Sequence, residues 1–231
     1  MEYGYIDENV KAIREKLCAA ALSAQRSPDD VTLLAAVKYA SAPEIEHLCK
    51  RSGITHIGEN RVQQLTEHLS ELDRGDAKLH FIGTLQTNKV KYIIDKVDMI
   101  ESLDSVKLAA EIDRQAKKRG VKMDVLCEIN IGKEENKSGI MPQDVEAFCE
   151  QIAGFDSLNL RGFMTMAPIC EKKSDYRKYF SQTYELSLDI WTKKLHNIER
   201  PVISMGMSDS FEEAIMCGSN IVRVGRRLFV K

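Results

Sequence analysis

Lys38 is the residue of this 231-residue chain whose type and position best suit covalent chemistry. It follows the apolar run Leu33-Leu34-Ala35-Ala36-Val37, which predicts a buried strand, so Lys38 is expected where that strand leaves the core. A partly desolvated lysine amine is a nucleophile and forms a Schiff base with an aldehyde that is held beside it. An ordinary solvated lysine on a short loop is the other interpretation, and a nearby binding site for the aldehyde is what decides between them.

Two segments near the C-terminus have the composition of a phosphate site. Ser204-Met205-Gly206-Met207-Ser208-Asp209 joins an apolar run to the start of a predicted helix, and Arg223-Val224-Gly225-Arg226 ends the last apolar run. Free backbone N–H groups, hydroxyls and a glycine that lets the backbone come close all favour an anion. Ser204 and Ser208 are therefore candidate phosphate ligands. A strand residue and a simple helix N-cap are equally good interpretations of these two serines.

Arg223 and Asn60 are candidates for contacts with the rest of such a ligand. Arg223 falls where an inward-facing residue near the end of the last strand is expected, and a buried guanidinium needs a partner. The nitrogen of a bound pyridine ring is such a partner, and an arginine there leaves this nitrogen unprotonated. The amide of Asn60 suits a phenolic oxygen, or alternatively the N-cap of a helix that begins at Arg61.

Eight short apolar runs with helical patterns between them predict the frame that positions these residues. The runs are Thr32 to Val37, Thr55 to Gly58, Leu79 to Gly83, Met99 to Leu103, Val125 to Ile131, Leu160 to Met166, Val202 to Met207 and Ile221 to Gly225. Such alternation is typical of an α/β fold with a parallel sheet, and eight strands close a (β/α)8 barrel of the TIM type. Functional residues of these barrels gather where the strands end, which is where Lys38, Asn60 and Arg223 are expected.

The predicted helices have recognisable beginnings and ends. Ser41-Ala42-Pro43-Glu44 has the pattern of a capping box, and the helix from Asp209 to Cys217 is expected to be capped by Ser208 or Asp209. We expect one domain over residues 1–231, in which residues 1–30 supply an extra N-terminal helix that packs on the barrel. The apolar face of that helix carries Val10, Ile13, Leu17 and Ala21.

Composition excludes several other classes of function. Lys+Arg total 33 against 35 Asp+Glu, a net charge of −2, so no overall field favours nucleic acid or an anionic membrane. The N-terminus lacks the pattern of a signal peptide and no apolar run is long enough to span a bilayer, which predicts a cytoplasmic protein. The six cysteines form no C-x-x-C pair and are expected to be reduced. The five histidines show no metal-ligand spacing, so we expect no metal, and we assign no catalytic residue.

With these residues in view, the sequence resembles the pyridoxal phosphate homeostasis protein family (the YggS/PROSC group), whose barrel is similar to the N-terminal domain of alanine racemase. The resemblance runs nearly from end to end and rests on seven motifs in a fixed order. They are Leu33-Leu34-Ala35-Ala36-Val37-Lys38, Gly58-Glu59-Asn60, His80-Phe81-Ile82-Gly83 followed by Leu85-Gln86-Thr87-Asn88-Lys89, Asn136-Lys137-Ser138-Gly139, Arg161-Gly162-Phe163-Met164, Ser204-Met205-Gly206-Met207-Ser208-Asp209 and Val222-Arg223-Val224-Gly225.

This resemblance implies a cofactor and a role for several residues. Pyridoxal 5'-phosphate (PLP) would be bound covalently to Lys38 as a Schiff base, with Arg223 at the pyridine nitrogen. Ser208 and the backbone of Gly225-Arg226 would contact its phosphate. The sequence departs from the family pattern at three positions, which are Val37 (often serine or threonine), Arg226 (usually threonine) and Val230 (usually glycine). We interpret Arg226 as a charged phosphate ligand, and we expect Arg227, on an extended segment, to point the other way.

The resulting prediction is a non-catalytic PLP-binding protein that serves intracellular PLP homeostasis and delivers PLP to apo-enzymes. We expect a monomer with no nucleic-acid or membrane partner. The alternative is an alanine-racemase-like PLP enzyme that acts on amino acids. Such an enzyme needs a second acid or base on the opposite face of the ring, which related racemases take from an additional domain and a dimer partner. With Lys231 so soon after the eighth apolar run, we expect no such group here.

Overall fold

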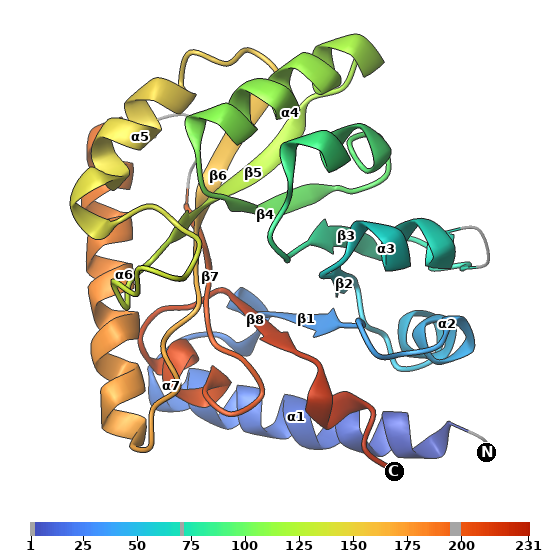
Figure 1. The fold of residues 1–231 in the computed structure, drawn as a ribbon. Coiled ribbons are helices and arrows are strands. Elements are labelled where there is room, and N and C mark those ends of the chain that lie inside the picture. The colour runs from blue at the N-terminus through green and yellow to red at the C-terminus, as the bar shows by residue number, and fades with distance from the viewer. Residues whose placement is uncertain (1–2, 70–71, 195–199) are drawn as a thin grey trace.

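A closed barrel of parallel strands forms the centre of this computed structural model, which describes residues 3–69, 72–194 and 200–231 (Figure 1). The strands pair in chain order, and the last returns to pair with the first. In the described residues there are eight, which confirms the predicted (β/α)8 barrel, and each predicted apolar run overlaps one of them. They are β1 (Thr32–Ala36), β2 (His56–Glu59), β3 (Lys78–Phe81), β4 (Met99–Leu103), β5 (Met123–Ile129), β6 (Leu158–Thr165), β7 (Val202–Ser204) and β8 (Ile221–Val224).

Strand β7 is shorter than the sequence predicts. The apolar run continues to Met207, but the strand ends at Ser204. Gly206 adopts φ +92°, a backbone conformation that only glycine takes readily, and its carbonyl accepts a hydrogen bond from the N–H of Arg223 at 3.0 Å. The chain therefore turns away from the barrel before Ser208, and Ser208 lies on a loop beside β8.

Helices surround the barrel (Figure 1). Between β3 and β4, where every residue is described, the predicted helical pattern is realised only as a 3₁₀-helix, η2 (Thr87–Tyr92). The other short 3₁₀-helices are η1 (Pro28–Asp30), η3 (Pro142–Asp144) and η4 (Arg226–Leu228). The α-helices of the described residues are α1 (Gly4–Ser23), α2 (Ala42–Lys50), α3 (Val62–Leu69), α4 (Val106–Arg119), α5 (Val145–Ile152), α6 (Lys173–Lys194) and α7 (Phe211–Met216).

Helix α1 fills a place in the outer ring. It packs against α7, α2 and η4, and in Figure 1 it runs along the base of the view beneath β1 and β8. The described residues after β8 form only η4, so α1 occupies the position between α7 and α2 that an eighth barrel helix would take. Asn9 joins it to the other end of the chain, because its Nδ2 donates to the carbonyls of Leu228 at 3.2 Å and Val230 at 2.8 Å.

The predicted helix caps are partly correct. The capping box before α2 is present, with the N–H of Ser41 donating to Glu44 Oε2 at 2.8 Å. The prediction for α7 is wrong, because this helix begins at Phe211 and its N-cap is Ser210, whose Oγ accepts from the N–H of Met207 at 3.2 Å. Ser208 lies in the tight turn after Gly206, so its hydroxyl does not cap α7.

Residues of each strand alternate between the interior of the barrel and the layer beneath the helices. On β1, Leu33 and Ala35 pack outward, whereas Leu34 lies inside the barrel with Ile82 and Ile221. The interior is narrow, because a Cβ on Gly58 would lie 2.6 Å from Leu34 Cδ2. Lys38 comes two residues after the end of β1, in a turn at the C-terminal end of the barrel strands.

Candidate functional site

Lys38 lies two residues beyond the end of β1, at the mouth of the barrel formed by the C-terminal ends of the strands. It is half-buried, and its Nζ lies 4.9 Å from the centroid of the Tyr39 ring. Gln64 of α3 donates from Nε2 to the Lys38 carbonyl at 3.0 Å, which fixes the backbone at this point. The structure therefore places Lys38 where the sequence predicts, with its backbone held by a neighbouring helix.

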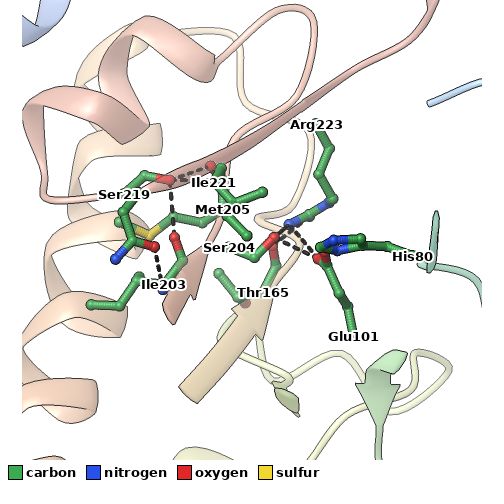
Figure 2. A network of polar contacts seen from close by, with 10 residues as sticks. His80, Glu101, Thr165, Ile203, Ser204, Met205, Ser219, Ile221 and Arg223 are labelled. Atoms are coloured by element: carbon green, nitrogen blue, oxygen red, sulfur yellow. Dashed lines mark hydrogen bonds and ion pairs between the residues drawn. The ribbon is translucent and has the colours of Figure 1, made fainter. Parts of the chain in front are cut away.

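Arg223 of β8 lies inside the barrel, as predicted, and is 5% exposed. Figure 2 shows its side chain directed towards Ser204 and Glu101. Nη1 donates to Ser204 Oγ at 2.7 Å, and Nη2 donates to the carbonyl of Thr165 at 2.9 Å. The carboxylate of Glu101 lies 4.0 Å from Nη1. Within the protein, the buried guanidinium thus has both hydrogen-bond acceptors and a counter-charge.

Glu101 is the acidic centre of this network and is fully buried. Its Oε2 accepts from Ser204 Oγ at 2.6 Å, and its Oε1 lies 2.7 Å from Nδ1 of His80 (Figure 2). Burial on its own raises the pKa of Glu101, but the hydrogen bond and charge of His80, together with Arg223 and Ser204, outweigh it and lower that pKa. Glu101 is therefore a carboxylate, which makes His80 Nδ1 the hydrogen-bond donor.

Ser204 ends β7 and is completely buried. Its hydroxyl accepts from Arg223 and donates to Glu101, so both of its hydrogen-bonding roles are used inside the barrel. Of the two interpretations that the sequence leaves open for Ser204, this geometry matches the strand residue.

Ser208 and Gly225 lie on neighbouring loops at the ends of β7 and β8. Ser208 is only 6% exposed, yet its hydroxyl and its N–H make no hydrogen bond to any described residue. The N–H groups of Gly225 and Arg226 are likewise free within the described part of the chain. A Cβ on Gly225 would lie 2.8 Å from the carbonyl oxygen of Ala36, so glycine allows the end of β8 to approach β1. The two loops together present unused donors of the kind that bind anions.

Asp209 connects the two loops through ion pairs with both arginines that follow Gly225. Arg226 Nη2 lies 2.8 Å from Asp209 Oδ2, and Arg227 Nη2 lies 3.3 Å from Oδ1. The prediction that Arg227 points the other way is wrong, because the segment forms η4 rather than an extended strand. Successive residues of a 3₁₀ turn are not on opposite faces, so both guanidinium groups reach the same carboxylate.

Asn60 follows β2 at the same mouth and is half-buried. Its side chain makes no hydrogen bond to a described residue, and α3 begins two residues later at Val62. The N-cap interpretation is therefore not realised, and the amide of Asn60 is available to a ligand.

Two acids lie across the mouth, the buried Glu128 on β5 and the half-buried Asp104 after β4. Glu128 accepts from Ser138 Oγ at 2.9 Å, and burial raises its pKa despite this bond. Burial also raises the pKa of Asp104. Glu128 lies on β5 and Asp104 directly follows β4, so this side of the mouth is acidic. The side formed by the β7 and β8 loops carries free hydrogen-bond donors instead.

Sequence reasoning missed Glu101 and His80 as parts of the site. The available signal was Glu101 itself, an acid in the middle of the apolar run from Met99 to Leu103, because a charge in a buried strand requires a partner. One departure from the family pattern does not touch the site, because Val37 is fully buried on the outward face of the β1 exit. Val230 is exposed beyond η4.

The described residues show no group of three or more His, Cys, Asp or Glu side chains placed to hold a metal ion. His196 lies outside the described residues, and the side chain of His68 is not described. All six cysteines are free, as predicted. None of the described helices has the length and apolar character needed to cross a membrane.

Comparison with known proteins agrees with this fold and these motifs. The family model of the alanine racemase N-terminal domain matches residues 6–230. The pyridoxal phosphate homeostasis protein of Aquifex aeolicus is 38% identical over 222 residues, which cover 96% of each chain. The protein of the same name from Escherichia coli strain K12 is 32% identical over 228 residues, 97% of this chain and 95% of the relative. The solved structure of PipY from Synechococcus elongatus, with PLP bound, has a TM-score of 0.81 and 30% identity, and covers 94% of this chain and 100% of that chain.

These relatives are more than 30% identical to this chain over nearly its whole length, and the barrel geometry and the ordered motifs support the same assignment. The chain belongs to the pyridoxal phosphate homeostasis protein family, within the wider group that shares the alanine racemase N-terminal domain.

Proposed function

We propose that this protein binds PLP, carries it as a Schiff base on Lys38 and serves the homeostasis of the cofactor, delivering it to apo-enzymes in the cytoplasm. Its family and the PLP bound in PipY support the proposal. The observation that carries it is the position of Lys38, which follows β1 at the barrel mouth, beside the strand that ends in the free donors of the β8 loop. The amine and the proposed anion site therefore share the same mouth of the barrel, as a Schiff base with a phosphorylated aldehyde requires.

The β7 and β8 loops fit the phosphate of PLP. The hydroxyl of Ser208, a residue that is only 6% exposed, makes no hydrogen bond to the described residues, and a phosphate oxygen would supply a partner. The free N–H groups of Gly225 and Arg226 add backbone donors, and the absence of a side chain on Gly225 keeps the approach open. We assign Ser208, the backbone of Gly225 and the guanidinium of Arg226 to the phosphate.

Arg223 fits the nitrogen of the pyridine ring. When bound, PLP supplies a reactive aldehyde and an electron-accepting ring. A guanidinium does not give up its proton, so at the ring nitrogen it donates a hydrogen bond and leaves that nitrogen unprotonated. Ser204 contributes by positioning Arg223, and Asn60 is assigned to the phenolic oxygen of PLP. An unprotonated ring is a weak electron sink, which favours a carrier over the alternative, an alanine-racemase-like enzyme that acts on amino acids.

Reduction with borohydride followed by peptide mapping tests the proposal. The purified protein is incubated with PLP, its visible spectrum is recorded, and the complex is reduced and digested. We expect a pyridoxyl group on the peptide that contains Lys38, and no such peptide modification in Lys38→Ala. Loss of the adduct with an unchanged far-UV circular dichroism spectrum separates chemistry from folding.

Lys107→Ala is the matched control. Lys107 is an exposed lysine in the first turn of α4, which directly follows a strand exit. Its removal should leave the adduct on Lys38 unchanged. An adduct found only on other lysines of the wild-type protein would refute the assignment of Lys38, and measurable racemisation of alanine by the wild type but not by Lys38→Ala would favour the enzyme.

A further inference from the structure

An acid lies beside the proposed phosphate site, and it holds the arginine assigned to that phosphate. Asp209 directly follows Ser208, and its carboxylate pairs with Arg226 at 2.8 Å. The Arg226 side chain is 75% exposed, so its guanidinium is positioned by ion pairing rather than by packing. A solvent-exposed pair of this kind is weak and exchanges easily.

A phosphate ester and a carboxylate compete for the same guanidinium. Both accept two parallel N–H bonds from an arginine, and a dianionic phosphate carries the larger charge. Arg226 bound to Asp209 is thus an arginine withheld from the phosphate. Because Asp209 is adjacent to Ser208, the guanidinium needs only rotations of its own side chain to change partners.

Arg227 lowers the free energy needed for Arg226 to leave Asp209. It contacts the other oxygen of Asp209, Oδ1, at 3.3 Å. When Arg226 turns to an anion at Ser208, the carboxylate of Asp209 therefore keeps one cationic partner and is not left unpaired beside the anion. Because Asp209 pairs with two arginines, one of them can move to an anion while the other remains on the carboxylate.

We propose that Asp209 limits the affinity of the site for phosphate esters by competing for Arg226. This inference rests on the proposed function, since it concerns the phosphate of the same cofactor. The competition suits a carrier, because a site that binds its cargo with every available charge would release it slowly.

Equilibrium titration at fixed ionic strength tests the competition, with inorganic phosphate, PLP and pyridoxal as ligands. Asp209→Asn should bind phosphate and PLP roughly two- to fivefold more tightly than the wild type, the range that an exposed ion pair implies. Pyridoxal, which lacks the phosphate, should bind equally well to both. In an Arg226→Ala background, the same Asp209→Asn change should give little or no gain.

Asp189→Asn is the matched control for charge. Asp189 of α6 is 54% exposed and pairs with Lys193, while Asp209 is 56% exposed, so both variants remove one carboxylate of similar exposure. Asp189→Asn should leave phosphate affinity unchanged. Unfolding midpoints measured in parallel establish that each variant is folded.

Three results would overturn the proposal. They are unchanged or weaker phosphate binding by Asp209→Asn, an equal gain with and without Arg226, and a lack of phosphate binding in every variant. Failure of the proposed function is detected separately, as the absence of a reduced adduct on Lys38. An adduct on Lys38 combined with an unchanged affinity in Asp209→Asn would leave the carrier function standing and remove only the competition.

Discussion

Arg223 carries a charge into the interior of the barrel, where it faces Glu101 across 4.0 Å. Burial lowers the pKa of Arg223, and Glu101 acts against this effect by stabilising the charged form. Removing one partner of a buried pair leaves the other charge uncompensated, which costs far more than the pair contributes while intact. The stability of the apo-protein therefore reports on a residue that we place at the cofactor ring.

Glu101→Gln should destabilise the apo-protein by about 3 kcal/mol, because the amide keeps the size of the side chain but removes the counter-charge that most stabilises Arg223. Urea unfolding followed by circular dichroism measures this difference. Glu46→Gln, on the exposed face of α2, is the control and should shift the midpoint little. Equal midpoints for both variants would mean that Arg223 does not depend on Glu101.

His56 predicts a pH dependence of stability. Burial, followed by the nearby charges of His80 and Lys78, lowers its pKa from 6.5 to about 4. Since the unfolded chain takes up the proton first, the contribution of His56 to stability is complete above pH 6.5. It is lost as the pH falls from 6.5 towards 4, by at most about 1.4 kcal/mol per pH unit for one proton.

Urea midpoints measured from pH 7 to pH 5 test this dependence. The window lies above the ordinary pKa values of Asp and Glu, 3.8 and 4.5, so most carboxyl groups contribute little to it. His56→Gln should flatten the profile in this range. A profile that is equally steep in this variant would assign the proton uptake to another histidine.

The residues of the site divide into those that alternation predicts and those that depend on three-dimensional contacts. Lys38 and Arg223 were predictable, because each follows from its place at the end of one apolar run. The partners of Arg223 were not, because Glu101 and Ser204 come from strands that meet it only inside the closed barrel. Likewise, no pattern within the sequence indicates that Asp209 would engage both Arg226 and Arg227.

At the scale of elements, the junction of β6 with β7 depends on a glycine. Gly162 has φ +148°, lies where the register of β5 against β6 shifts, and pairs with Val202. A Cβ at this position would lie 2.0 Å from the carbonyl oxygen of Val202. Neither the backbone conformation nor the space permits a side chain, since the obstacle is the backbone of a neighbouring strand.

Gly162→Ala should destabilise the protein by more than about 4 kcal/mol or prevent folding, through strain and loss of the β6–β7 pairing. Gly120→Ala is the control, because Gly120 also has a positive φ, +67°, at the end of α4 but has open space around it. That change should cost only about 1–2 kcal/mol. Soluble expression and urea midpoints measure both, and similar losses would show that backbone conformation alone decides the effect.

Elements with strong local signals were predictable from the sequence, and those shaped by their neighbours were not. β4 begins and ends as its apolar run predicts, and α2 begins at its capping box. The end of β7 and the cap of α7 differ from prediction, because Gly206 takes a positive φ that alternation of apolar residues does not encode. The same holds for η4, where a 3₁₀ turn replaces the expected extended segment.

At the scale of the whole molecule, α1 links the two ends of the chain, and Asn9 provides the polar part of this link. Asn9→Ala should lower the free energy of unfolding by about 1 kcal/mol, because the carbonyls of Leu228 and Val230 lose their donor. Native-state hydrogen exchange should also show faster exchange of the α1 amides. Glu8→Ala, one residue earlier on an exposed face, is the control. Identical exchange in the two variants would contradict this role of Asn9.

The pairing of β1 with β8 has a consequence for the order in which the protein is made. A ribosome releases β1 long before the strand that closes the barrel against it, from Ile221 to Val224. Until then β1 has one unpaired edge, and such long-range closure is slow compared with local folding. Lys38 and Gly225 come together only through this pairing, so a nascent chain that lacks β8 has the lysine but not the donors of the β8 loop. On the proposed function, capture of PLP consequently waits until β8 has joined β1.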